Sequence, residues 1–128
     1  MLGTNDVKQR FSATPGNIAN GMERLVAKAI HTPDAWRNQP NILIIAPPPI
    51  EKGYYETSIG PEMGKDCMEK SMSLSPLYQD IAERLHCHFL DAASIPGLRM
   101  YPYDYMHLSL EAHRLLAEKL ATLIPQIC

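Results

Sequence analysis

Residues 42–49 read Ile-Leu-Ile-Ile-Ala-Pro-Pro-Pro, and this stretch decides the fold class of the chain. The first five residues are apolar and mostly β-branched, which is typical of a strand buried on both faces in a parallel sheet. The three prolines that follow cannot donate to a sheet ladder, so they end the strand abruptly. The sequence therefore predicts a short interior strand over Ile42–Ala46 and an irregular segment after it.

Helical patterns stand on either side of this strand. A helix is predicted from a Thr14 cap to Ile30, because Pro15 suits the first helical position and apolar residues then recur at helical spacing. A second helix begins at Ser75, or already near Ser71, and a third follows a Ser109 cap. Each of these helices has one apolar stripe, so each is expected to pack against a sheet.

A second short strand is predicted over Cys87–Asp91, and no linker or repeat divides the sequence. Alternating helices and strands imply right-handed crossovers, so we expect an α/β fold: a three-layer, flavodoxin-like parallel sheet with helices on both faces. The apolar Met1 and Leu2 are followed at once by Gly-Thr-Asn-Asp, like the last residues of a strand and its exit loop. We therefore expect a third strand to end at Leu2, and residues 1–128 to be the C-terminal part of one domain.

Composition restricts the function. The 128 residues carry 12 basic and 14 acidic side chains, and this net charge of −2 argues against sequence-independent nucleic-acid binding. The aliphatic run at 42–46 is too short to span a membrane. The cysteines are Cys67, Cys87 and Cys128, without CxxC spacing. They are interpreted as reduced thiols of a cytoplasmic protein, although one of them could pair between chains.

Two polar clusters carry the chemistry. In the segment 104–109, Asp104 and His107 are three positions apart, so the carboxylate can accept from one imidazole nitrogen and leave the other free to take a proton. In the segment 3–6, the Asn5 amide offers two donors of the kind that an oxyanion hole needs. Both segments are expected at the carboxyl edge of the sheet, where active sites form. Taken singly, each motif is weak.

Together the motifs resemble the SGNH (GDSL-type) hydrolases, in particular their arylesterase and acyltransferase branch. Residues 1–6 resemble the family's third block and residues 104–109 its fifth. Other stretches that resemble family segments are Phe11, Thr14-Pro15, Ile18-Ala19, Ile42–Pro49, Leu77-Tyr78, Ile81-Ala82 and Asp91-Ala92. The resemblance implies that His107 is the general base, Asp104 its orienting acid and Asn5 an oxyanion donor. It also implies a small acetyl or aryl ester as substrate, and neither a metal nor an organic cofactor.

The sequence departs from the family in one respect. The family's nucleophile lies in a Gly-Asp-Ser block near the N-terminus, and a second block supplies an oxyanion Gly; neither block is present. None of the seven serines follows Gly-Asp or lies in GxSxG: Ser12, Ser58, Ser71, Ser73, Ser75, Ser94 and Ser109. We therefore expect negligible esterase activity from the chain alone. We also expect it to form a homo-oligomer or to pair with the missing N-terminal half, through residues 1–5 and the 14–30 helix.

Other interpretations stay open. The chain can be a non-catalytic fragment or an assembly module of the same fold. A phosphate-binding flavodoxin-like domain would use residues 3–5, but only one glycine lies in that loop. The His86-Cys87-His88 segment could offer two imidazoles to a metal, but no third ligand has suitable spacing. His31 and His113 are interpreted as ordinary helix residues.

Overall fold

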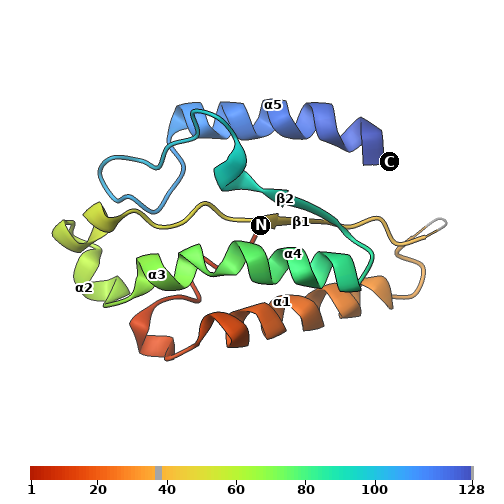
Figure 1. Ribbon diagram of the computed structural model, residues 1–128, viewed down its shortest axis with the longest axis horizontal. Helices are drawn as coiled ribbons and strands as arrows, with labels where there is room; N and C mark the ends of the chain where they lie inside the picture. Colours follow the sequence, from red (N-terminus) through yellow and green to blue (C-terminus); the bar gives the residue numbers. More distant parts are fainter. Residues whose placement is uncertain (37–38, 128) are drawn as a thin grey trace.

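The computed structural model describes residues 1–36 and 39–127 (Figure 1). Along the chain the helices and strands are α1 (Pro15–Ile30), β1 (Leu43–Ala46), α2 (Gly60–Met63), α3 (Cys67–Met72), α4 (Leu74–Arg84), β2 (His88–Asp91) and α5 (Leu110–Ile127). Short 3₁₀ helices lie at Gln9–Phe11, Lys52–Glu56 and Ala92–Ser94. None of the helices among the described residues is long and apolar enough to cross a membrane.

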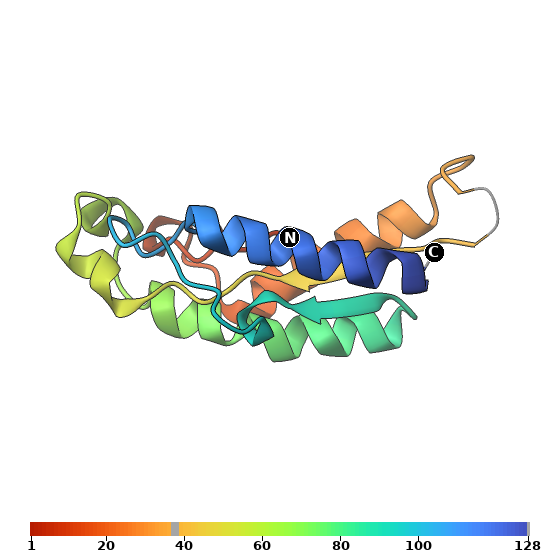
Figure 2. The same ribbon diagram turned by 90° about the horizontal axis from the view of Figure 1, so that it is seen from above.

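The two strands β1 and β2 are parallel, with Leu43 opposite His88 and Ala46 opposite Asp91. Helices α1 and α4 lie on one side of the strands and α5 on the other (Figures 1 and 2). The predicted α/β class with a parallel strand pair is therefore confirmed, and both strands lie within one residue of their predicted starts. The described part of the chain forms two strands, however, and not the three that the sequence analysis expected.

The prediction that Met1 and Leu2 end a third strand is wrong, because neither residue joins the sheet. A strand exists only where a neighbour accepts and donates its backbone hydrogen bonds. The Leu2 carbonyl instead accepts a hydrogen bond from the Tyr78 hydroxyl of α4, at 3.2 Å. This contact ties the N-terminal segment to the helix layer.

Helix α1 begins where the sequence predicts. The Thr14 hydroxyl accepts from the Asn17 backbone N–H at 3.1 Å, and Asn17 Oδ1 accepts from the Thr14 N–H at 3.3 Å. Together these two bonds form a capping box, which satisfies two backbone donors that the first turn leaves free. The buried side chains of α1 are Ile18, Ala19, Met22 and Val26. Their spacing of three to four residues gives the apolar face that packs against α4.

The second predicted helix is divided in two. The sequence analysis gives two possible starting points for this helix, near Ser71 and at Ser75. The first lies in α3 and the second in α4, with Ser73 between the two helices. Pro76 is the third residue of α4. A helix tolerates proline in its first turn, because the backbone nitrogens there have no carbonyl of the same helix to donate to. The buried side chains of α4 are Leu74, Tyr78, Ile81 and Ala82. They form the centre of the main core with β1 and α1.

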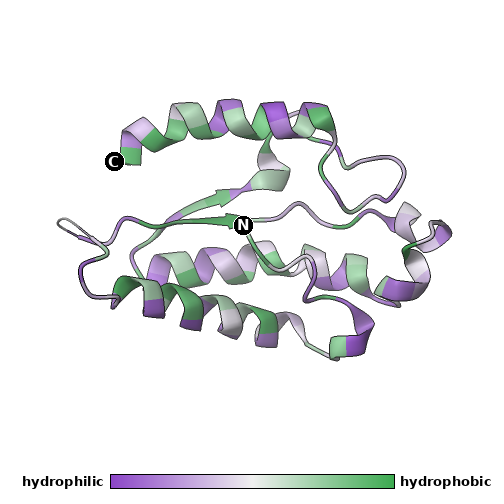
Figure 3. Ribbon diagram, turned by 180° about the vertical axis from the view of Figure 1, so that it is seen from behind, coloured by the Kyte–Doolittle hydropathy of each residue, from purple (hydrophilic) through white to green (hydrophobic). Residues whose placement is uncertain are grey.

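Burial is unequal across the molecule. In β1, Ile44 and Ala46 are buried, whereas Leu43 and Ile45 are only half-buried, so the expectation of a strand covered on both faces is wrong. Helix α5 buries Ala112 alone, against a small cluster with Ile95 and Leu98. Figure 3 shows hydrophobic residues along both strands, and mixed hydrophobic and hydrophilic residues along α1 and α5. Apolar surface is thus left uncovered beside the strands.

Candidate active site

The loop before α5 is organised around the Asp104 carboxylate. Its Oδ1 accepts from the backbone N–H groups of Met106 and His107, each at 2.9 Å. Its Oδ2 lies 2.9 Å from the ring Nδ1 of His107, which is the hydrogen bond that the spacing predicts. Asp and His three positions apart can meet because this short turn folds the chain back onto the carboxylate.

The same contacts fix the ionisation of the carboxyl group. Partial burial would raise the pKa of Asp104, but the N–H groups of His107 and Met106 and the imidazole outweigh it and hold that pKa below its ordinary value. Asp104 is therefore a carboxylate at neutral pH and an acceptor only, so His107 Nδ1 carries the shared proton. The His107 side chain is 69% exposed, and its Nε2 makes no hydrogen bond within the described part of the chain.

Backbone contacts hold this loop against the rest of the fold. The Tyr101 N–H donates to the His107 carbonyl at 2.7 Å, and the Glu51 N–H donates to the Tyr105 carbonyl at 3.0 Å. Tyr105 has a left-handed φ of 56°, and its ring lies against Gly53, where a Cβ would come within 2.6 Å of it. The turn that presents His107 is therefore anchored to the segment that follows β1.

The loop that carries Asn5 is anchored to α4. Gly3 has a φ of +120° and its carbonyl accepts from the Asp6 N–H at 3.0 Å, so the chain turns sharply after Leu2. A side chain at position 3 would come within 2.6 Å of the Tyr78 hydroxyl, and only glycine permits this approach. The exposed Asn5 amide makes no hydrogen bond within the described part of the chain, so its donors are available.

Both predicted clusters line one pocket of about 200 Å³. Asn5 and His107 are both in its wall, although they lie at opposite ends of the sequence, and Asp104 lies behind His107. The other lining residues are Met1, Thr4, Pro47, Pro48, Met100, Met106, Leu108 and His113. The wall is therefore mostly apolar, with one amide, one hydroxyl and two imidazoles.

One lining residue was missed by the sequence analysis, which treated His113 as an ordinary helix residue. Its backbone N–H donates to the Ser109 carbonyl at 3.0 Å, and the Ser109 hydroxyl accepts from the Ala112 N–H at 3.1 Å. The first turn of α5 thus sets His113 beside the loop that carries His107. The signal that could have found it is its position one turn after the predicted Ser109 cap.

The other histidines lie elsewhere. His31 is the C-cap residue that follows α1, and its Nδ1 lies 2.7 Å from the Ala27 carbonyl. In the segment 86–88, His86 has a left-handed φ of 53° and both imidazoles are exposed. Among residues 1–36 and 39–127, no three His, Cys, Asp or Glu side chains are close enough to hold a metal ion.

No family model and no curated protein matches the chain. Solved structures do. A carbohydrate acetylesterase family member from Sinorhizobium meliloti is 33% identical with a TM-score of 0.84, over 99% of this chain and 59% of that one. Est24, a carbohydrate acetylesterase from the same organism, is 34% identical with a TM-score of 0.74, over 96% and 59%. The M. smegmatis aryl esterase is 26% identical with a TM-score of 0.82, over 100% and 59%.

The chain thus spans 59% of the length of these three enzymes. Its own fold matches theirs almost from end to end, at TM-scores well above the level of chance similarity. These comparisons confirm the resemblance to the SGNH hydrolase family, of the acetylesterase and arylesterase kind, over nearly the whole of this chain.

Proposed function

We propose that this chain is the C-terminal part of a serine carboxylic-ester hydrolase of the SGNH type. It would supply the acid–base pair and one oxyanion donor of a single three-layer, flavodoxin-like domain. The observation that carries the proposal is the 2.9 Å hydrogen bond between Asp104 Oδ2 and His107 Nδ1, beside a pocket that Asn5 also lines. The likeness to acetylesterases and an aryl esterase supports the same reaction class.

In the proposed reaction, the free Nε2 of His107 takes the proton of a serine hydroxyl as that oxygen attacks the ester carbonyl. Asp104 keeps the Nδ1 proton in place and stabilises the imidazolium that forms. The Asn5 amide donates to the oxygen that becomes negative in the tetrahedral intermediate. The tetrahedral intermediate then collapses: the bond to the alcohol breaks, His107 returns its proton to the departing alcohol, and the acyl group stays on the serine oxygen as an ester. A water molecule that gives its proton to His107 attacks this ester, and the serine oxygen takes the proton back as the acid is released.

The substrate proposed is a small ester of the acetyl or aryl kind. Six of the ten residues that line the pocket are apolar: Met1, Pro47, Pro48, Met100, Met106 and Leu108. Such a wall favours a short acyl group or an aromatic alcohol over a charged one, because a charged group there would lose its hydration without a partner.

The nucleophile is proposed to come from a polypeptide other than these 128 residues. All seven serines lie in the described part of the chain, and none of them lines the pocket. Ser109 is occupied as a helix cap, Ser71 is buried, and Ser75 donates to Asp91 at 2.8 Å. Pairing with an N-terminal half would bring a serine to the pocket; a homo-oligomer would not.

The proposed location is the cytoplasm. The free thiols of Cys67 and Cys87 support it, because thiols stay reduced there.

A chimera tests the proposed function. The part of S. meliloti Est24 that this chain does not match is joined in front of residue 1, and hydrolysis of p-nitrophenyl acetate is measured. We expect turnover that His107→Ala abolishes and Asp104→Asn lowers by about 100- to 10,000-fold. The matched control is His31→Gln, an exposed imidazole at the end of α1 that is expected to leave turnover unchanged. A folded chimera without turnover, or with turnover that survives His107→Ala, would refute the proposal.

A further inference from the structure

A second hollow adjoins the pocket that His107 lines. Its volume is about 420 Å³, larger than the 200 Å³ of the pocket, and the two share Pro48 and Met100 as lining residues. Three methionines line this hollow, Met68, Met72 and Met100, so it is called here the methionine hollow. A molecule that reacts at His107 can therefore extend past Pro48 and Met100 into it.

Hydrogen bonds tie the walls of the methionine hollow together. The Ile50 N–H donates to the Ser71 hydroxyl at 2.9 Å, and that hydroxyl donates to the Met68 carbonyl at 2.7 Å. These bonds join the segment after β1 to α3. On the other side, the Arg99 carbonyl accepts from the Ser109 N–H at 3.2 Å, which joins the third wall to the start of α5. The hollow is thus held in a fixed position relative to the catalytic loop.

The apolar part of the methionine hollow suits a flat organic group. Leu98 and Met100 are buried, Met68 is half-buried and Met72 is 57% exposed. A methionine side chain is unbranched and polarisable, so it adapts to ligands of different shape and makes favourable contacts with aromatic rings. These four side chains therefore offer a surface on which an aromatic ring can lie.

The charged part of the methionine hollow favours an anion. Its charged lining residues are the cations Lys52 and Arg99 and the carboxylate Glu51, which leaves one positive charge in surplus. Within the described part of the chain, neither cation forms an ion pair, and Arg99 Nη1 donates only to the Leu98 carbonyl, at 3.2 Å. The guanidinium keeps donors for a ligand, and its planar fork matches the two oxygens of a carboxylate.

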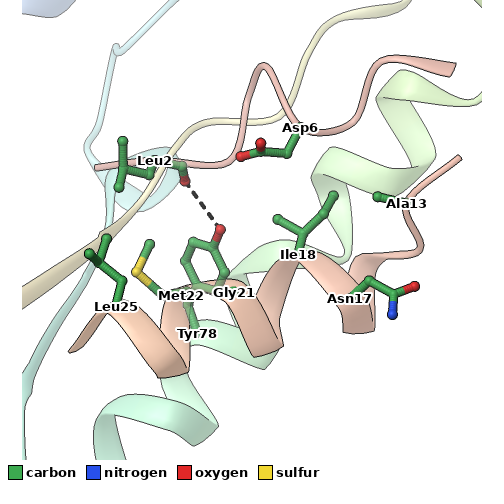
Figure 4. Close-up of a pocket in the computed structure, with 9 residues that line it drawn as sticks. All are labelled: Leu2, Asp6, Ala13, Asn17, Ile18, Gly21, Met22, Leu25 and Tyr78. Atoms are coloured by element: carbon green, nitrogen blue, oxygen red, sulfur yellow. Dashed lines mark hydrogen bonds between the residues drawn. The ribbon is translucent and has the colours of Figure 1, made fainter. Parts of the chain in front are cut away.

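A hollow between the N-terminal segment and α1 has the opposite charge. Figure 4 shows Asp6 on that segment, across from Ile18 and Met22 of α1. Among the described residues, Asp6 is the only charged one that lines this hollow, so an anion there would meet a like charge and no cation. An anionic ligand is therefore expected in the methionine hollow and not in this one.

We propose that the methionine hollow binds the alcohol part of the ester, and that this alcohol is aromatic and carries a carboxylate held by Arg99 and Lys52. The inference rests on the proposed function and narrows its substrate class. The smaller pocket beside His107 receives the acetyl group, in keeping with its mostly apolar wall. The carboxylate lies past Met100, outside that pocket, where the two cations and water replace its hydration.

Binding of the product alcohol to the 128-residue chain tests the inference without catalysis. The methionine methyl groups are labelled with carbon-13, and 4-hydroxybenzoate or its neutral analogue 4-hydroxybenzamide is titrated by nuclear magnetic resonance. We expect the Met68 and Met72 signals to move and the Met22 signal, from the hollow in Figure 4, to stay in place. The carboxylate is expected to bind about tenfold more tightly than the amide, because it gains a charge-assisted hydrogen bond.

Three variants separate the charges. Arg99→Gln is expected to bring the ratio of the two dissociation constants close to one, and Glu51→Gln to increase it, because the repelling carboxylate is removed. Lys119→Gln is the matched control, since it removes an exposed positive charge from α5 that does not line the hollow, and it should leave the ratio unchanged.

Turnover by the chimera with Est24 gives the second readout. Its substrates are 4-acetoxybenzoate and 4-acetoxybenzamide, and we expect kcat/KM to favour the first by about tenfold, through a lower KM. Binding of 4-hydroxybenzoate at Met68 with no hydrolysis of either ester would support the hollow and refute the proposed function. The inference is overturned if both esters react equally well, if both alcohols bind equally tightly, or if Met22 moves and Met68 does not.

Discussion

Both oxygens of the Asp104 carboxylate accept hydrogen bonds from His107. The backbone N–H of His107 donates to Oδ1 and its ring Nδ1 to Oδ2, each at 2.9 Å. One residue is thus held at two points by a partner three positions earlier in the same turn. The orientation of the imidazole is therefore a property of this loop, and it does not depend on the presence of a nucleophile.

The pH dependence of stability follows from this contact. The pKa of Asp104 is held below its ordinary value in the folded chain, so the ionised carboxylate stabilises the fold above its unfolded pKa. This stabilisation is lost as the pH falls through the lower, folded pKa. We expect Asp104→Asn to lower the free energy of unfolding at pH 7, with a difference from the wild type that shrinks below about pH 4. Denaturant unfolding between pH 2 and 7 measures it.

The control for this experiment is Glu56→Gln, which removes an exposed carboxylate from a 3₁₀ helix. Its difference from the wild type is expected to stay near zero over the same range, because exposed carboxylates contribute little. A difference for Asp104→Asn that stays constant down to pH 2 would mean that the charge of Asp104 does not stabilise the fold.

The isolated chain is expected to hydrolyse p-nitrophenyl acetate no faster than free imidazole does. His107 has its acid partner but no serine in the pocket, and without an activated nucleophile little acceleration remains. A fluorophosphonate probe should label none of the seven serines. Turnover well above the imidazole background that disappears in His107→Ala would contradict this expectation, as would specific labelling of one serine.

Two glycines test the anchoring of the N-terminal loop. Gly3→Ala is expected to lower the free energy of unfolding by about 2 kcal/mol, because φ is +120° and the new Cβ would meet Tyr78. Gly21→Ala is the matched control, an exposed helical position with nothing within 4 Å. Alanine there should raise the same free energy by about 0.5–1 kcal/mol. Similar effects of the two substitutions in thermal unfolding would contradict the strained turn at Gly3.

The features that the sequence predicts correctly depend on neighbouring residues. Helix α1 follows from its Thr14 cap and apolar spacing, and the Asp104–His107 hydrogen bond from a three-residue separation. Asn5 and His107 are far apart in the sequence, but the rule that functional loops share the carboxyl edge of a parallel sheet predicts their common pocket. Their roles in a reaction stay predictions.

The features that the sequence does not predict depend on contacts between distant segments. Residues 50–66 fold into short helices because Tyr54, fully buried, donates through its hydroxyl to the Gly64 carbonyl at 2.8 Å. The buried Cys67 thiol likewise donates to the Val7 carbonyl at 3.4 Å. No local sequence pattern predicts such hydrogen bonds between distant residues. The strand expected to end at Leu2 fails for a related reason, since its apolar character alone supplies no partner in the sheet.

Tyr78 is expected to position the segment that carries Asn5. Its side chain is 1% exposed and its hydroxyl donates to the Leu2 carbonyl at 3.2 Å. Burial, together with the nearby Asp6 carboxylate, raises the pKa of Tyr78 to about 12, so the unfolded chain ionises first and stability falls above about pH 10.

Tyr78→Phe should lower the free energy of unfolding at pH 7 by about 1 kcal/mol, remove this alkaline decline and speed amide exchange in residues 3–6. Tyr103→Phe, at a position 76% exposed, is the control and should change none of these quantities. Unfolding curves at pH 7 and 11 with exchange by nuclear magnetic resonance measure all three, and unchanged exchange at residues 3–6 in Tyr78→Phe would show that another contact holds Asn5.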